Sequence, residues 1–238
     1  MGRFGVAGKY AGFAVTTIRR HGLIGTVRDL IAELAFDRRH GLRALLPAEV
    51  VASGCARPGR AEMDAVQYQG VSPRAGAKIL SRLPPVALRS TFIDFGCGKG
   101  RGLALGMLAG FRRLHGVELL PSLAMAADRS LQRLRTRYPE SILQVSSGDA
   151  AVFPLPSGAV VAFLYNPFRG ATLRNVAGRL REHSVAYPVW VVYVNPVDLA
   201  AFEGQGFSVE TELHRGRHLE AVILVPPPMV DSRDWRNG

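Results

Sequence analysis

The sequence lacks any apolar run long enough to cross a membrane, and it contains only two cysteines, Cys55 and Cys97. A membrane-spanning helix needs about 18 or more consecutive apolar residues. Two cysteines are too few for the disulfide framework of a small secreted protein. We therefore expect a protein of a reducing compartment, located in the cytoplasm. Cys97 lies inside a glycine-rich segment, where we interpret it as a small filling side chain, with a reactive thiol as the alternative.

Acidic residues are absent from residues 1–28, which carry Arg3, Lys9, Arg19, Arg20 and Arg28. The formal net charge is +11, and residues 1–60, with ten Lys/Arg and four Asp/Glu, contribute +6 of it. Such a field attracts nucleic acid or an anionic membrane surface, so peripheral membrane contact is one expectation; the alternative is a solvated basic face. The apolar stretch "AGFAVTTI" is not followed by the cleavage site of a secretory signal peptide. An N-terminus rich in arginine and poor in acids also resembles a mitochondrial transit peptide, which is a further alternative.

The length of 238 residues and the hydrophobic content of 47% are typical of one domain with a modest extension. We predict a basic N-terminal helical extension over residues 1–66, a main domain over residues 67–226 and a loose tail over residues 227–238. Residues 23–36 place apolar side chains at helical spacing, which predicts an amphipathic helix.

From residue 91 onward, apolar runs alternate with helical patterns. This alternation indicates an α/β protein with a Rossmann-like seven-stranded mixed sheet, mostly parallel and closed by a C-terminal antiparallel hairpin. The predicted strands are 91–95, 112–119, 141–147, 159–165 and 189–194, followed by hairpin strands 207–213 and 219–225. The predicted helices are 73–83, 101–110, 121–137, 171–183 and about 197–203.

The segment "FIDFGCGKGRG" at residues 92–102 places glycines at alternate positions, Gly96, Gly98 and Gly100, after Asp94. Alternating glycines let the backbone turn tightly and approach a ligand closely. A P-loop needs Ser or Thr after the Gly-Lys pair, and the dinucleotide pattern fails in each register. The remaining pattern is acid-x-G-x-G-x-G. Its carboxylate would repel a pyrophosphate and attract a ligand that carries an amino group.

Further polar residues follow the next strands, where ligands bind in open α/β sheets. Glu118 ends the second strand and can accept hydrogen bonds from both hydroxyls of a ribose. Asp149 and Ala150 follow the third strand, where a carboxylate can accept from an exocyclic amine and a backbone amide can donate to a ring nitrogen.

The fourth strand ends in "YNPF", which contains Asn166, Pro167 and Phe168. Asn166 offers a carbonyl and an amide, and Phe168 can form a wall against a planar or cationic group. Because Pro167 disfavours helical geometry in the residue before it, we expect Asn166 to be extended. A second Asn-Pro pair, beginning at Asn195, ends the fifth strand and favours a polar rim there. An Asn-Pro turn that only ends the strand is the alternative.

The ordered set "FIDFGCGKG", "GVELLP", "GDA" and "YNPF" resembles the class I, seven-strand S-adenosylmethionine-dependent methyltransferases over about residues 68–225. More narrowly, "FDRRHG", "YQGVSP" and "YNPF" resemble an uncharacterised bacterial subgroup. The resemblance implies S-adenosyl-L-methionine as cofactor. It also implies cofactor-binding residues, which are Tyr68, Ser72, Asp94, Gly96, Cys97, Gly98, Gly100, Glu118, Asp149 and Ala150.

The "NPF" element, Asn166 to Phe168, is similar to the Asn/Asp-Pro-Pro-Tyr/Phe element of enzymes that methylate amino nitrogens, with one proline instead of two. The resemblance implies methyl transfer to an amino nitrogen on a protein side chain or small molecule, without a metal. Two alternatives are a nucleic-acid methyltransferase and a non-catalytic S-adenosylmethionine-binding protein. A nicotinamide-dependent enzyme fits the glycine spacing less well.

Overall fold

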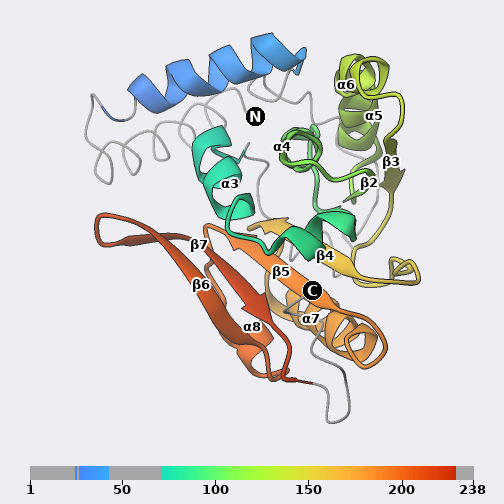
Figure 1. The fold of residues 1–238 in the computed structure, drawn as a ribbon, viewed down its shortest axis with the longest axis vertical. Coiled ribbons are helices and arrows are strands. Elements are labelled where there is room, and N and C mark those ends of the chain that lie inside the picture. The colour runs from blue at the N-terminus through green and yellow to red at the C-terminus, as the bar shows by residue number, and fades with distance from the viewer. Residues whose placement is uncertain (1–24, 26, 43–70, 229–238) are drawn as a thin grey trace, which may run out of the picture.

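The computed structural model of the chain describes residue 25, residues 27–42 and residues 71–228. A seven-stranded sheet runs through the described part in the order β3-β2-β1-β4-β5-β7-β6 (Figure 1). The strands are β1 (Thr91–Phe95), β2 (Arg113–Glu118), β3 (Ile142–Ser147), β4 (Val160–Tyr165), β5 (Val189–Val194), β6 (Ser208–Arg215) and β7 (His218–Val225). Strands β1 to β5 are parallel, and β7 pairs antiparallel with both β5 and β6. The predicted mixed sheet with a C-terminal hairpin is confirmed.

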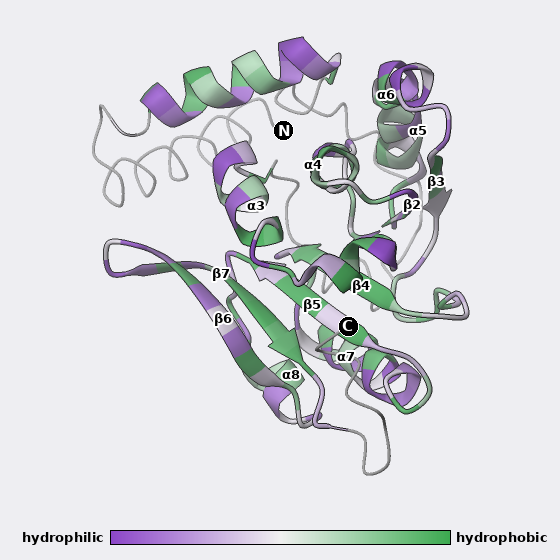
Figure 2. Ribbon diagram, in the orientation of Figure 1, coloured by the Kyte–Doolittle hydropathy of each residue, from purple (hydrophilic) through white to green (hydrophobic). Residues whose placement is uncertain are grey.

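The central strands are buried because their sequences are apolar on both faces. Every residue of β5 is buried, and in β4 only Tyr165 is partly exposed. Continuous runs of Val, Ile and Phe are typical of strands that are covered on both sides. Figure 2 shows these apolar residues along β4, β5 and β7.

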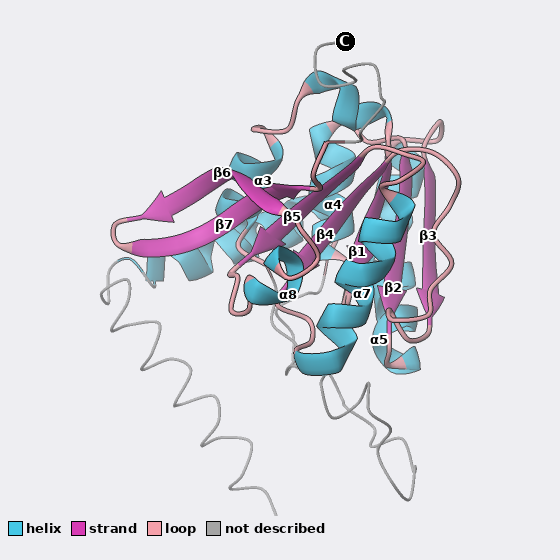
Figure 3. Ribbon diagram, turned by 90° about the horizontal axis from the view of Figure 1, so that it is seen from below, coloured by secondary structure: helices cyan, strands magenta, loops and turns pink. Residues whose placement is uncertain are grey.

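Helices cover the sheet in two layers (Figure 3). One apolar cluster joins the sheet to α3 (Pro73–Leu80), α4 (Arg101–Ala109), α5 (Pro121–Ser130) and α6 (Gln132–Arg137). The second cluster joins it to α7 (Gly170–His183) and α8 (Ala200–Glu203). The helix predicted over residues 121–137 is divided at Leu131, and the last predicted helix is shorter than expected. A short 3-10 helix, Pro85–Arg89, precedes β1.

A further helix, which we call the N-terminal helix, covers residues 27–40. It extends beyond the predicted end at residue 36 and runs past α3 and α4 (Figure 1). Leu42, just after it, is buried in the cluster that includes α4. The predicted boundary between residues 66 and 67 lies outside the described residues and stays a prediction.

Candidate functional site

The strand order places two predicted site segments at one edge of the sheet. The chain leaves β1 toward β2 and β3 on one side and returns to β4 on the other, so β1 and β4 are neighbours whose following loops diverge. Ligands of open α/β sheets bind at such a switch point. A Cβ atom added to Gly96 would overlap the side chain of Pro167. The structure therefore brings the loop after β1 into contact with the turn after β4.

The loop after β1 has the tight backbone that the glycine spacing predicts. Gly96, Gly98 and Gly100 have φ angles of 74°, 53° and 87°, in the left-handed region that favours glycine. The amides of Gly96 and Cys97 both donate to the carbonyl of Val117, at 2.8 and 3.1 Å. The loop is thus held against the end of β2.

Glu118, at the end of β2, lies beside this loop. Its Oε2 accepts the Gly98 amide at 2.9 Å, and its Oε1 accepts the Leu120 amide at 3.0 Å. Only 7% of Glu118 is exposed, and burial raises the pKa of its carboxyl group. A carboxylate offers about four lone-pair sites, so these two hydrogen bonds leave capacity for further donors. Glu118 therefore orders the glycine loop, and its ribose role stays a prediction.

Asp94 lies under the first turn of α4 and is only 3% exposed. Its carboxylate accepts the Leu103 amide, and a Cβ on Gly102 would overlap its Oδ2. Burial and the negative charge of Glu118 raise the pKa of Asp94 to about 8. A nearby cation would stabilise the ionised form. The pair of acids beneath the glycine loop therefore makes this edge of the sheet suited to a positively charged ligand.

A backbone hydrogen bond holds the residues after β3 next to Glu118. The Gly148 amide donates to the Glu118 carbonyl at 2.9 Å. Asp149 accepts the Ala151 amide through Oδ1 at 2.8 Å, which closes a turn of its own. Ala150 is buried at 8% exposure and packs in the second apolar cluster. The structure therefore places the predicted adenine-binding residues at the same edge as Glu118.

Asn166 does not have the extended backbone geometry that the sequence predicts, so this prediction was wrong. Its φ is 43°, a left-handed conformation that Asn tolerates better than most residues, and Asn195 has a similar φ of 50°. The Asn166 side-chain oxygen Oδ1 is buried and has no hydrogen-bond partner in the described part of the chain. Leaving such an oxygen unsatisfied costs about 1–3 kcal/mol, so it points to a missing donor.

Phe168 has a packing role that sequence reasoning did not identify. It is 6% exposed and belongs to the cluster that joins α7 to the sheet. Its ring is therefore a core side chain in this structure, which differs from the predicted wall of a binding pocket. Burial of Phe168 fixes the chain that follows Pro167.

The remaining predicted cofactor residues have different positions. Cys97 is buried, lies close to Gly116, and burial raises the pKa of its thiol, which supports the role of a filling side chain. Ser72 caps α3, because its hydroxyl accepts the Ala75 amide at 3.5 Å. Tyr68 lies outside the described residues.

Sequence reasoning missed a buried ion cluster directly after the glycine loop. Arg101, the first residue of α4, is 2% exposed. It donates to both oxygens of Asp37 at 3.0 and 2.9 Å and to Glu33 at 2.9 Å. It also donates to the carbonyl of Val71 at 3.1 Å. The partners lie 64 and 68 residues before Arg101, and the only local signal was the "FDRRHG" motif that contains Asp37.

Glu33 is the least buried carboxylate of this cluster. Its burial nevertheless raises the pKa of its carboxyl group more than the positive charge of Arg101 lowers it. The pKa of Arg101 is raised, because the two carboxylates outweigh its burial. The cluster links the N-terminal helix to the residue that follows the loop.

Neither a cluster of metal ligands nor a membrane-spanning helix is found within the described residues. No group of three or more His, Cys, Asp or Glu there could hold a metal ion. Among the helices of residues 25–42 and 71–228, none is long and apolar enough to cross a membrane.

Solved structures with this arrangement include methyltransferases. The pyocyanin biosynthetic protein PhzM matches with a TM-score of 0.51 and 18% identity, over 64% of this chain and 54% of that chain. The glycopeptide N-methyltransferase MtfA complexed with (S)-adenosyl-L-methionine matches with a TM-score of 0.50 and 15% identity, over 68% of this chain and 96% of that one. The complex of MtfA with sinefungin gives a TM-score of 0.51 and 14% identity over the same shares.

No protein-family model matches the sequence, and no curated protein does. The chain spans about half the length of PhzM, with 54% of that protein covered. At identities of 18% or less, the likeness concerns the path of the backbone and not the chemistry. The order of its strands and these structural matches show that the chain has the α/β fold of the class I methyltransferases.

Proposed function

We propose that the protein is an S-adenosylmethionine-dependent methyltransferase whose acceptor is an amino nitrogen on a protein side chain or small molecule. The observation that carries the proposal is the unsatisfied buried oxygen of Asn166, which lies in the turn packed against the glycine loop. A fold of this class supports the same reading.

The residues at the switch point fit S-adenosyl-L-methionine. The sulfonium and ammonium groups of this cofactor are positive, and the buried acids Asp94 and Glu118 lie beside the glycine loop. The loop amides approach a ligand closely because Gly96, Gly98 and Gly100 carry no side chains. Asp149 and Ala150 would hold the adenine at the end of β3. When bound, the cofactor supplies an activated methyl group, so the protein mainly needs to position the acceptor.

Asn166 would provide that positioning. Its Oδ1 would accept the N–H of the acceptor and hold the nitrogen in a fixed direction. Pro167 restrains the turn because its ring lies against Gly96, and buried Phe168 anchors the following residue. Small errors in such positioning are costly, because orientation of the reacting groups supplies much of the rate.

We also propose that the protein is a member of the bacterial subgroup that its "FDRRHG", "YQGVSP" and "YNPF" motifs resemble. The bond from Arg101 to Asp37 supports a structural role for the "FDRRHG" motif, which would hold the N-terminal helix on the cofactor end of the sheet. A nucleic-acid acceptor and a non-catalytic S-adenosylmethionine-binding protein are the alternatives. We place the protein in the cytoplasm, with a peripheral membrane contact that is argued below.

Calorimetric titration tests the cofactor, and label transfer tests the reaction. We expect S-adenosylhomocysteine to bind and NAD not to bind. Incubation with methyl-labelled cofactor and a fractionated lysate should then place label in protein or small molecules. Label in RNA or DNA alone would favour the nucleic-acid alternative. Binding of S-adenosylhomocysteine without transfer to any fraction would favour the non-catalytic one.

A further inference from the structure

Four apolar side chains of the N-terminal helix lie on its exposed side. Val27, Leu30, Ile31 and Leu34 are 47%, 49%, 60% and 52% exposed. Their spacing of three and four residues places them on one face of the helix, which we call the apolar stripe. A helix on the surface of a globular domain normally turns such a face toward the core. This helix does the opposite.

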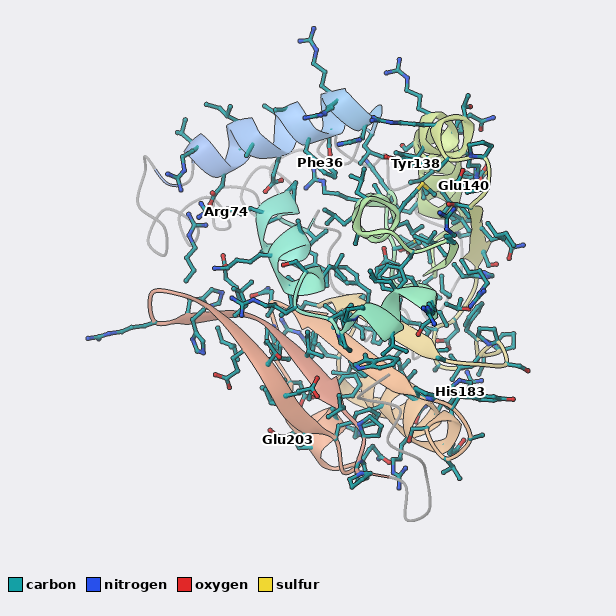
Figure 4. All side chains as sticks on the ribbon, viewed as in Figure 1. Phe36, Arg74, Tyr138, Glu140, His183 and Glu203 are labelled. Carbon is teal, nitrogen blue, oxygen red and sulfur yellow. The ribbon has the colours of Figure 1, made fainter. Side chains whose placement is uncertain are left out.

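Ion pairs hold the helix in this orientation. Asp29 pairs with Arg215 at the end of β6, with a distance of 2.6 Å between Oδ2 and Nη1. Glu33 and Asp37, four and eight residues later, pair with Arg101, each at 2.9 Å. Figure 4 shows Phe36 on the side of the helix nearer the domain, and its side chain packs against the core. Three acids at helical spacing therefore fasten one face to the domain, so the apolar stripe points away from it.

The remaining charged side chains of the N-terminal helix are positive. The three acidic residues of the helix are engaged with arginines of the domain, whereas Arg28, Arg38 and Arg39 are exposed. The preceding residues 1–24 add Arg3, Lys9, Arg19 and Arg20 and no acid. An apolar stripe flanked by arginines is the pattern of a helix that lies in the interface of a bilayer with anionic lipids.

We propose that the outward face of the N-terminal helix docks the protein on an anionic lipid surface. The apolar stripe enters the boundary between headgroups and acyl chains, and the arginines contact the anionic headgroups. Nucleic acid fits less well, because a phosphate backbone offers nothing to four exposed aliphatic side chains. Since the same helix is bonded to Arg101 after the glycine loop, the docked surface lies next to the cofactor end of the sheet.

Vesicle sedimentation with the full chain tests this surface. The probes are vesicles of phosphatidylglycerol mixed with phosphatidylcholine, and vesicles of phosphatidylcholine alone, at low and physiological salt. The stripe variant is Ile31→Gln with Leu34→Gln, and the matched control is Met125→Gln with Val185→Gln, which are 56% and 66% exposed elsewhere on the domain. The charge variant is Arg28→Gln with Arg39→Gln.

We expect wild type to bind the anionic vesicles and not the neutral ones. The stripe variant should lose at least about tenfold in partitioning, because it replaces the two most exposed of the four apolar side chains with polar ones. The charge variant should lose about fivefold for each arginine, with the loss largest at low salt. The control variant should bind like wild type, and the melting temperatures of all four proteins without lipid should agree.

Any one of four results would overturn the proposal. The first is equal partitioning of the wild type and the stripe variant. The second is a melting temperature lowered by the stripe variant without lipid, which would mean that the chain itself covers the stripe. The third is a dimer in sedimentation velocity that the stripe variant dissociates, which would assign the face to a second copy of the chain. Tighter binding to a duplex oligonucleotide than to vesicles, unchanged in the stripe variant, would also contradict lipid docking. Each result is independent of methyl transfer.

Discussion

The ring of Pro167 lies so close to Gly96 that a Cβ atom on Gly96 would overlap the Pro167 Cβ. This contact joins the loop after β1 to the turn after β4, two segments that are 71 residues apart in the sequence. It places the turn that contains Asn166, whose side-chain oxygen is buried and unsatisfied, beside the glycine loop. The proposed cofactor and acceptor positions therefore meet through a single close packing contact.

Gly96→Ala should destabilise the protein and abolish binding of S-adenosylhomocysteine. Alanine in a left-handed conformation costs about 1 kcal/mol, and the overlap with Pro167 adds to that cost. Gly216→Ala is the matched control, because Gly216 has a φ of 61° and nothing within 4 Å of an added Cβ. Thermal melting and calorimetry measure both effects. Equal losses in the two variants would mean that the contact with Pro167 has no role.

Glu118→Gln should lower the affinity for S-adenosylhomocysteine by about tenfold to a hundredfold, since charge-assisted hydrogen bonds are worth about 1.5–3 kcal/mol. It should also lower the melting temperature, because the new amide group faces one of the two backbone donors, Gly98 or Leu120. The exposed Glu203→Gln on α8 serves as control. A folded Glu118→Gln variant with wild-type affinity would place Glu118 outside the site.

Asn166→Ala should reduce turnover and leave cofactor affinity almost unchanged. Loss of about 2–4 kcal/mol of transition-state stabilisation corresponds to a decrease of about 30- to 1000-fold in rate. Asn166→Asp should be milder, because it keeps an acceptor oxygen. Asn195→Ala is the matched control, since Asn195 also precedes a proline and has a similar φ of 50°. Normal turnover of Asn166→Ala, with only a lower melting temperature, would remove the argument for an amino nitrogen.

Asp37→Asn should destabilise the protein by about 3–5 kcal/mol, because it removes a negative charge paired with the buried Arg101 and replaces one of two acceptor oxygens with a donor. It should also weaken cofactor binding, since Arg101 directly follows the glycine loop. Asp128→Asn removes an ion pair with Arg135 in which the Asp128 side chain is 55% exposed, so it should cost about 1 kcal/mol or less. Denaturant unfolding compares the two variants, and similar losses would refute a special role for the buried cluster.

The apoprotein should lose stability as the pH rises from about 4 to about 8. Asp94 ionises near pH 4 in the unfolded chain, whereas burial and the charge of Glu118 raise its pKa to about 8 in the folded protein. The folded state therefore binds an extra proton within this window, and its contribution to stability falls as the pH increases.

Binding of a cationic ligand favours the ionised form of Asp94, so it should release a proton below pH 8. Calorimetry in buffers of different ionisation enthalpy measures this release. Asp94→Asn should abolish the release and weaken the pH dependence of stability, while the raised pKa values of Glu118 and Glu33 keep the rest of it. Proton release that persists in this variant would assign it to another group.

Local patterns were enough to predict most of the fold. Strand β1 has the predicted bounds, and so does β5, because continuous apolar runs reveal buried strands without information about their neighbours. The glycine loop could also be predicted from the sequence. The left-handed φ angles of Gly96, Gly98 and Gly100 depend on the absence of a side chain at each position, which is a local property.

Contacts between distant segments set the features that the sequence did not reveal. Asn166 is left-handed although Pro167 follows it, and Phe168 packs in the core, both within a turn that lies against the glycine loop. The periodicity of residues 23–36 predicted an amphipathic helix, but periodicity does not tell which face is covered. The pairing of Asp29, Glu33 and Asp37 with arginines of the folded domain turns the apolar stripe outward, because buried charges require partners more strictly than aliphatic side chains require burial.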